Sequence, residues 1–72
     1  MNRYYLKAAR NSKRRTGLEA ATAIGISEGR YFRIETGRTP PTVEEMARLA
    51  DYLGFAVATI FPDASQGQEG AP

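Results

Sequence analysis

Cysteine and histidine are both absent from this sequence of 72 residues. Without cysteine there can be no disulfide and no thiolate metal site. Without histidine the chain also lacks the commonest general base and the commonest zinc ligand. There is no glycine-rich phosphate loop of the Walker type, and the adjacent acids Glu44 and Glu45 point to different faces of a helix. We therefore expect no enzyme activity, no metal and no cofactor.

Long apolar segments are missing too. No apolar run approaches the roughly 20 residues that span a bilayer. The opening MNRYYLKAARNSKRR also has no apolar stretch of the signal-peptide type. These absences predict a cytoplasmic protein. A chain of this length forms one small domain that buries only about 60% of its unfolded surface, so a partner subunit would add stability.

Basic residues are concentrated in the first half of the chain. Residues 1–38 carry nine Lys and Arg against three Glu, whereas residues 39–72 carry one Arg against five acidic residues. The formal net charge of only +2 hides this asymmetry. A basic half suggests a polyanionic partner such as nucleic acid, and the alternative is an ordinary solvated surface.

Signals for helix starts and ends divide the chain into five short helices. Thr16 with Glu19, and Thr42 with Glu45, have the spacing of a capping box, which marks a helix start. Glycines mark the ends, and the prolines of the segment 38–41 (RTPP) separate the third and fourth helices. The first predicted helix is capped by Asn2 and runs to about Arg14, and the second is 17–24. The third is capped by Ser27 and reaches Glu35 or Thr36, the fourth is 43–53, and a short apolar turn or helix within 55–61 comes last.

Apolar residues at helical spacing identify the expected core. The residues predicted to face inward are Leu6, Ala9, Ala20, Ala21, Ile24, Tyr31, Ile34, Val43, Met46, Leu49 or Ala50, and Leu53. At least one of Tyr4 and Tyr5 is expected to pack under the domain. The polar segment 62–72 is expected to be disordered, which leaves 1–61 as the domain. The predicted class is all-α, and the glycine-containing turn between the second and third helices indicates a helix-turn-helix unit.

The order of these signals resembles a known family. The pattern of the lambda-repressor-like, Cro/cI-type (XRE) helix-turn-helix domains is matched, without a gap, by Leu6 with Arg10, Ala21, Gly25-Ile26-Ser27, Ile34-Glu35-Thr36-Gly37, Leu53-Gly54 and Phe61. The resemblance covers roughly residues 4–61. It implies five α-helices, sequence-specific binding to double-stranded DNA and, usually, dimers that repress transcription. Gly17 departs from the pattern, because family members usually carry there a Gln that contacts the DNA backbone.

The resemblance places residues 27–36 on the recognition helix, which lies in the major groove. The predicted base-reading residues are Glu28, Gly29, Arg30, Phe32 and Arg33. Arg33 is expected to pair with guanine O6 and N7, and the alternative is a phosphate contact or a solvated charge. Arg30 is expected to do the same or to hold a phosphate. Glu28 either accepts from cytosine N4 or interacts favourably with the helix N-terminus.

Two members of this group leave a structural alternative open. The missing side chain of Gly29 either lets the backbone approach the bases or relieves a tight crossing with the second helix. Phe32 either touches a thymine methyl group or leans on the edge of the domain.

Other positions are expected to hold the DNA backbone or the fold. The residues expected to lie along phosphates are Arg14, Arg15, Thr16, Ser27, Arg38 and Thr39. Arg10 and Glu35 have counterparts that pair with each other in the family. This implies a structural ion pair between the first and third helices.

The last apolar residues bear on assembly. A single helix-turn-helix contacts too few base pairs for useful specificity, so a homodimer is expected, with half-sites about one helical turn apart. The expected interface is Leu49, Tyr52, Phe55, Val57, Ile60 and Phe61. The alternative is that these residues close the core of the monomer.

Together these features predict a DNA-binding transcriptional regulator of prokaryotic or phage origin. A dimeric repressor of phage or mobile-element type fits them, as does the autoregulating antitoxin of a toxin–antitoxin pair. The alternative is a protein-interaction module or coactivator of the same fold with little or no DNA specificity. Such a module would dock a toxin or another partner protein through Tyr52, Phe55, Val57 and Phe61.

Overall fold

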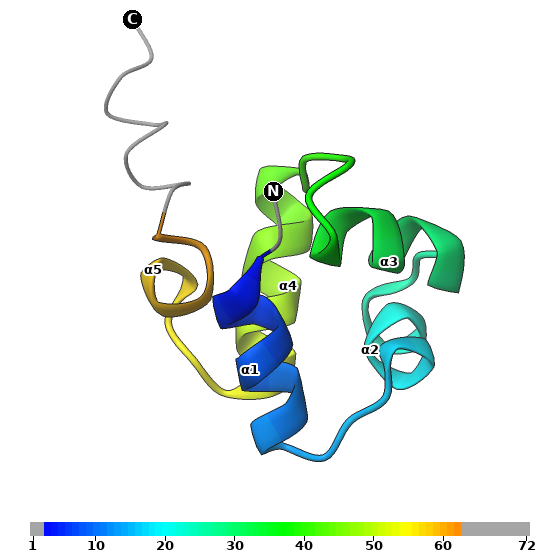
Figure 1. The fold of residues 1–72 in the computed structure, drawn as a ribbon. Coiled ribbons are helices and arrows are strands. Elements are labelled where there is room, and N and C mark those ends of the chain that lie inside the picture. The colour runs from blue at the N-terminus through cyan, green and yellow to red at the C-terminus, as the bar shows by residue number, and fades with distance from the viewer. Residues whose placement is uncertain (1–2, 63–72) are drawn as a thin grey trace, which may run out of the picture.

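The computed structural model of the chain describes residues 3–62 (Figure 1). Within that range it contains no strand and five α-helices, which are α1 (Tyr4–Ser12), α2 (Gly17–Ile24), α3 (Glu28–Glu35), α4 (Val43–Leu53) and α5 (Val57–Ile60). The predicted all-α class is confirmed. The cap predicted at Asn2 lies outside the described residues, as does the predicted disordered segment beyond Pro62.

Side-chain caps start α2 and α4. Thr16 Oγ1 accepts from the backbone N–H of Glu19 at 3.0 Å, and the Glu19 carboxylate accepts from the Thr16 N–H at 2.8 Å. Thr42 and Glu45 form the same two bonds at the start of α4. Both predicted capping boxes are therefore confirmed.

The first four helices end in the same hydrogen-bonded turn. In each, a backbone N–H donates to the carbonyl five residues earlier, across a residue in the left-handed conformation. That residue is Gly25 after α2, Gly37 after α3 and Gly54 after α4, but it is Arg14, with φ 56°, after α1. This turn ends α1 at Ser12, before the predicted limit at Arg14.

α4 lies at the centre of the fold, and α2 and α5 pack against it (Figure 1). α2 and α3 lie on one side, where α2 packs against both α3 and α4. α5 lies on the opposite side of α4, and α1 packs against α5 and α3. The outer surface of α3 is thus remote from α5.

The core takes apolar side chains from all five helices. Its buried members are Leu6, Ala9, Ala20, Ala21, Ile24, Tyr31, Ile34, Met46, Leu49, Ala50, Leu53, Ile60 and Phe61. Val43 was predicted to be inward but is 65% exposed. Side chains tilt toward the N-terminus of their helix, so the first residue of α4 projects past the end of the core. Tyr4 and Tyr5 are both exposed on the flanks of α1, so the expectation that one of them is buried is also wrong.

Half of the predicted dimer interface belongs to the core of the monomer. Leu49 and Phe61 have no exposed surface and Ile60 has 2%, because α5 folds back onto α1 and α4. The assignment of Leu49 and Phe61 to an interface between subunits is therefore wrong, whereas Ile60 lines a surface groove between α1 and α5. Tyr52 and Phe55 are half-buried, and Val57 is exposed, so these three remain available to a partner.

Candidate nucleic-acid interface

The turn between α2 and α3 holds α3 at the surface of the domain. Gly25 takes the left-handed conformation that ends α2, with φ 80°. Ser27 Oγ then accepts from the backbone N–H of Arg30 at 3.1 Å and starts α3. On the inner side of α3, Tyr31 and Ile34 have no exposed surface. Because these two side chains anchor α3, the opposite side of the helix faces outward.

A buried carboxylate ties α3 to α1. Glu35 accepts from Arg10 Nε at 2.9 Å, from Arg10 Nη2 at 3.2 Å and from the Tyr31 hydroxyl at 2.6 Å. Only 6% of the Glu35 side chain and 11% of the Arg10 side chain are exposed. Burial, with help from the bond to Glu35, raises the pKa of the Tyr31 phenol, and the bond to Glu35 raises the pKa of Arg10. The expected ion pair is present, and Tyr31 completes it as a third member.

Arg30 faces α4 and not the free side of α3. Its Nε donates to Glu45 Oε2 at 2.7 Å and its Nη2 donates to Glu45 Oε1 at 2.8 Å, which makes a bidentate ion pair. Hydrogen bonds from Arg30 and from the Thr42 backbone lower the pKa of Glu45 to about 2, so this carboxylate is charged at neutral pH. Arg30 was predicted to lie on the outer face, and that placement is wrong. Its guanidinium is turned instead toward Glu45 in the first turn of α4.

The outer face of α3 carries an acidic residue, a glycine, an aromatic residue and a basic residue. Glu28, Gly29 and Arg33 are exposed, and Phe32 is 41% exposed. Arg33 Nη1 lies 3.5 Å from the place where a Cβ on Gly29 would stand, so the guanidinium extends back along the bare part of the helix. Apart from that side chain, no atom outside the local helix backbone lies within 4 Å of this place. The hypothesis that Gly29 relieves a tight crossing with α2 is therefore wrong.

Some of the residues predicted to contact phosphates already interact with other groups of the domain, and others do not within the part of the chain that the structure describes. The hydroxyls of Thr16 and Ser27 already accept cap bonds. The Arg15 guanidinium lies over the Tyr52 ring, 5.7 Å from its centroid. Arg14 is exposed, and within residues 3–62 no hydrogen bond, ion pair or ring contact engages its side chain.

Two further phosphate candidates lie in the turn after α3. The backbone N–H groups of Arg38 and Thr39 donate to the carbonyl of Arg33 at 2.8 and 3.1 Å. Arg38 is exposed and Thr39 is half-buried. Their backbone is therefore fixed against the end of α3, directly beside its outer face.

Arg14 takes the strained left-handed conformation after α1 that a glycine takes after each of α2, α3 and α4. Replacing Arg14 by glycine is expected to raise the free energy of unfolding by about 0.5–1 kcal/mol, because glycine has no Cβ to oppose the left-handed conformation. Urea denaturation followed by circular dichroism measures this change. If Arg14 holds a phosphate, the same variant also lowers the slope of log affinity against log salt by about 0.9.

The matched control is Gly25→Ala, since nothing lies within 4 Å of the Cβ that it adds. Its expected loss of about 1–2 kcal/mol therefore measures the cost of a side chain in this conformation alone. A lower stability for the Arg14→Gly variant would contradict the strain that we assign to Arg14.

Three features of this interface escaped the sequence analysis. Glu45 gave a capping signal but no sign that it also binds Arg30. Tyr31 was identified as a core residue only, although a tyrosine four residues before Glu35 has the spacing for the observed hydrogen bond. The ring of Phe32 on α3 also packs against Gly17 at the start of α2, and this contact joins two helices whose crossing no local pattern determines.

Two classes of site are missing from residues 3–62. No group of three or more acidic residues in this range is arranged to hold a metal ion. None of the helices described has the length and apolar character needed to cross a bilayer.

Comparison with known proteins identifies the family. The model of a helix-turn-helix domain family matches residues 4–60, which covers all five helices. No curated protein and no solved structure matches the chain. The matching family belongs to the XRE, or lambda-repressor-like (Cro/C1-type), clan, is typically non-enzymatic, and consists of DNA-binding domains. This chain is therefore a member of the helix-turn-helix domain family of the lambda-repressor-like clan.

Proposed function

We propose that the protein is a sequence-specific transcriptional regulator that binds double-stranded DNA as a dimer and acts as a repressor. The observation that carries this proposal is the outward face of α3. Tyr31 and Ile34 hold the helix from below, while Glu28, Gly29 and Arg33 are left exposed. A helix presented in this way is suited to the major groove, where base edges carry a distinct pattern for each base pair.

The exposed residues divide into base readers and backbone contacts. Arg33 is the candidate for guanine, because a guanidinium donates to O6 and N7 together. Glu28 is the candidate for cytosine N4, an amino donor whose hydrogen bond offsets the repulsion of a carboxylate by phosphates. Arg14, Arg38 and Thr39 are the candidates for phosphate contacts on either side of the groove. Arg30 is left out of the base readers because Glu45 holds it.

A selection experiment tests the proposed function. The protein is incubated with duplexes of random sequence, and bound DNA is recovered over several rounds and sequenced. We expect a two-fold symmetric site, with half-sites about one helical turn apart. We also expect log affinity to fall linearly with log salt, by about 0.9 for each phosphate contacted. Failure to bind any duplex at low salt would refute the proposal.

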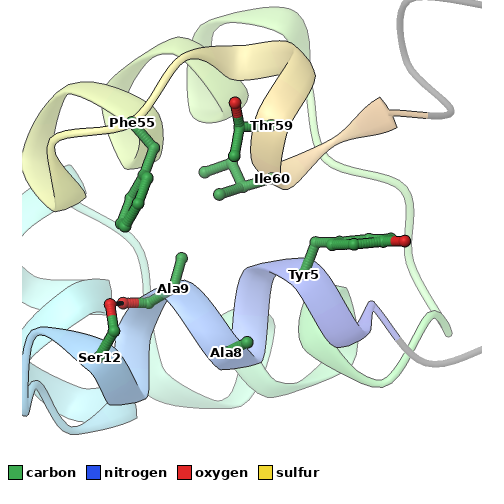
Figure 2. Close-up of a pocket in the computed structure, with 7 residues that line it drawn as sticks. All are labelled: Tyr5, Ala8, Ala9, Ser12, Phe55, Thr59 and Ile60. Carbon is green, nitrogen blue, oxygen red and sulfur yellow. Dashed lines mark hydrogen bonds between the residues drawn. The ribbon is translucent and has the colours of Figure 1, made fainter.

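A groove between α1 and α5 supports the dimer. It has a volume of about 230 Å³ and is lined by Tyr5, Ala8, Ala9, Ser12, Phe55, Thr59 and Ile60 (Figure 2). Figure 2 shows Phe55 and Ile60 facing α1 across the groove, with Tyr5 at one end. Because α5 lies opposite α3 with α4 between them, a second copy seated here leaves the outer face of α3 free. Sedimentation at micromolar concentration measures the expected dimer mass, and a monomer on and off DNA would contradict it.

The same groove also supports a second candidate function, a protein-interaction module with little DNA specificity. Exposed apolar residues of the same two helices, namely Tyr4 and Tyr5 on α1 and Val57 on α5, give a partner protein such as a toxin a surface to cover. The low-salt experiment separates the two candidates. A regulator binds random duplex DNA weakly and a selected site tightly, whereas an interaction module binds neither.

A further inference from the structure

Phe32 is seated in the gap left by the missing side chain of Gly17, which we call the Gly17 notch. A Cβ added to Gly17 would stand 2.8 Å from Phe32 Cζ and 3.3 Å from both Cε atoms. These distances place the tip of the ring where a side chain at the start of α2 would begin. Gly17 is buried although it stands at a helix N-terminus, because the ring covers it. Only glycine leaves room for this contact.

The ring is supported on a second side. Tyr31 and Phe32 meet edge to face, with centroids 5.9 Å apart and planes at 71°. Tyr31 is itself held by its hydrogen bond to Glu35 at 2.6 Å. Phe32 is therefore fixed between α2 and the buried part of α3 before any partner arrives.

The rest of the ring faces the candidate DNA surface. Phe32 remains 41% exposed, and it lies three residues after Gly29 and four after Glu28, on the same face of α3. A phenyl ring cannot bind a phosphate or the polar edge of a base. The apolar group that a major groove offers is the 5-methyl group of thymine. The partner on the base edges that suits an apolar ring held on the groove-facing side of the helix is therefore this methyl group.

We propose that Phe32, held in the Gly17 notch, is a specificity-determining residue that contacts the 5-methyl group of a pyrimidine. This assignment rests on the proposed function and adds to it a partner for the aromatic position. Gly17 then has a role of its own, because it makes the room that fixes the ring. At the start of α2, the ring of Phe32 thus occupies the place where the side chain of residue 17 would otherwise lie.

Methyl removal is the direct test. In the site selected by the wild-type protein, each thymine is replaced in turn by deoxyuridine, which pairs identically but lacks the methyl group. We expect about a three- to fivefold loss of affinity at one thymine of each half-site, the amount for one buried methyl group. Replacing that thymine by cytosine and then by 5-methylcytosine separates the methyl contact from base identity, because the added methyl group should restore part of the affinity.

Two variants connect the effect to the ring. Phe32→Ala removes the ring. Gly17→Ala keeps the ring but fills the notch, and it is expected to fold because alanine favours a helix. The tip of a rotatable side chain yields more easily than the backbone, so the ring should leave the notch. In both variants, deoxyuridine at the sensitive position should lower the affinity by less than 1.5-fold, or about 0.2 kcal/mol. Circular dichroism shows whether the variants are folded.

The outcomes separate this proposal from the function on which it rests. A protein that selects no site refutes the proposed function itself. A selected site in which no thymine is sensitive to methyl removal refutes only the role of Phe32. A full thymine effect that persists in the Phe32→Ala variant also overturns the proposal.

Discussion

Replacing Glu35 by alanine is expected to lower the free energy of unfolding by about 3–5 kcal/mol, because it leaves the half-buried charge of Arg10 without its acidic partner. The same change removes the acceptor of the buried Tyr31 hydroxyl, which now bonds to Glu35 at 2.6 Å. In a domain of this size, each kcal/mol lowers the melting temperature by about 4–8 °C. Thermal and urea denaturation followed by circular dichroism measure the loss, and a fully unfolded variant is also consistent with it.

A matched control is available on α4. Glu44 pairs with Arg48 at 2.7 Å, but both side chains are more than half exposed. Glu44→Gln is therefore expected to cost no more than about 0.5 kcal/mol. A further variant replaces the whole cluster with apolar residues, as Arg10→Met, Tyr31→Phe and Glu35→Leu together, and should recover at least half of the loss. A Glu35→Ala protein within 1 kcal/mol of the wild type would contradict the importance of the cluster.

Replacing Arg33 by alanine is expected to relax base preference at one base pair in each half-site. A bidentate contact between arginine and guanine discriminates against other bases by about 1–3 kcal/mol, or roughly five- to 150-fold in relative affinity. Arg33 suits this role because its guanidinium extends over Gly29 on the outer face of α3. Selection from random duplexes, repeated with the variant and compared position by position, measures the change.

Two other variants show whether the arginine contacts a base or a phosphate. Arg33→Lys keeps the charge but loses the planar fork, so it should retain most non-specific affinity and still lose the preference. Arg48→Ala removes the same charge from a position bonded to Glu44 and to the Ile24 carbonyl. It should leave the preference unchanged. Equal weakening of all sequences by Arg33→Ala, with an intact preference, would show a phosphate contact.

Local chemistry accounts for the parts of the structure that could be predicted. The capping boxes at Thr16 and Thr42 join residues only three positions apart, so their spacing was enough to place the starts of α2 and α4. The glycines that end α2, α3 and α4 act through their own backbone. Arg14 was not recognised in the same role after α1, because an arginine carries no such signal in sequence. The end of that helix was consequently predicted too late.

Contacts between helices account for most of what could not be predicted. Arg30 and Glu45 are 15 residues apart and meet only because the intervening loop returns α4 to the side of α3. Ile60 and Phe61 are apolar residues that will be buried somewhere. Sequence alone did not decide whether they would be buried in their own domain or against a second subunit. The seating of Phe32 over Gly17 depends in the same way on the angle between two helices.

The two ion pairs of α3 have a consequence for the shape of its target. Arg30 near the start of the helix is bound to Glu45, and Glu35 at its end is bound to Arg10. Both ends of α3 are thus held by ion pairs to other helices. The helix therefore has little freedom to tilt or shift when it binds a duplex whose shape does not fit it. Under the proposed function, the DNA must then change its shape to fit the protein. The free energy needed to bend DNA differs between base steps. Operators with easily kinked pyrimidine–purine steps at uncontacted positions would then be preferred over stiff ones with identical contacted bases.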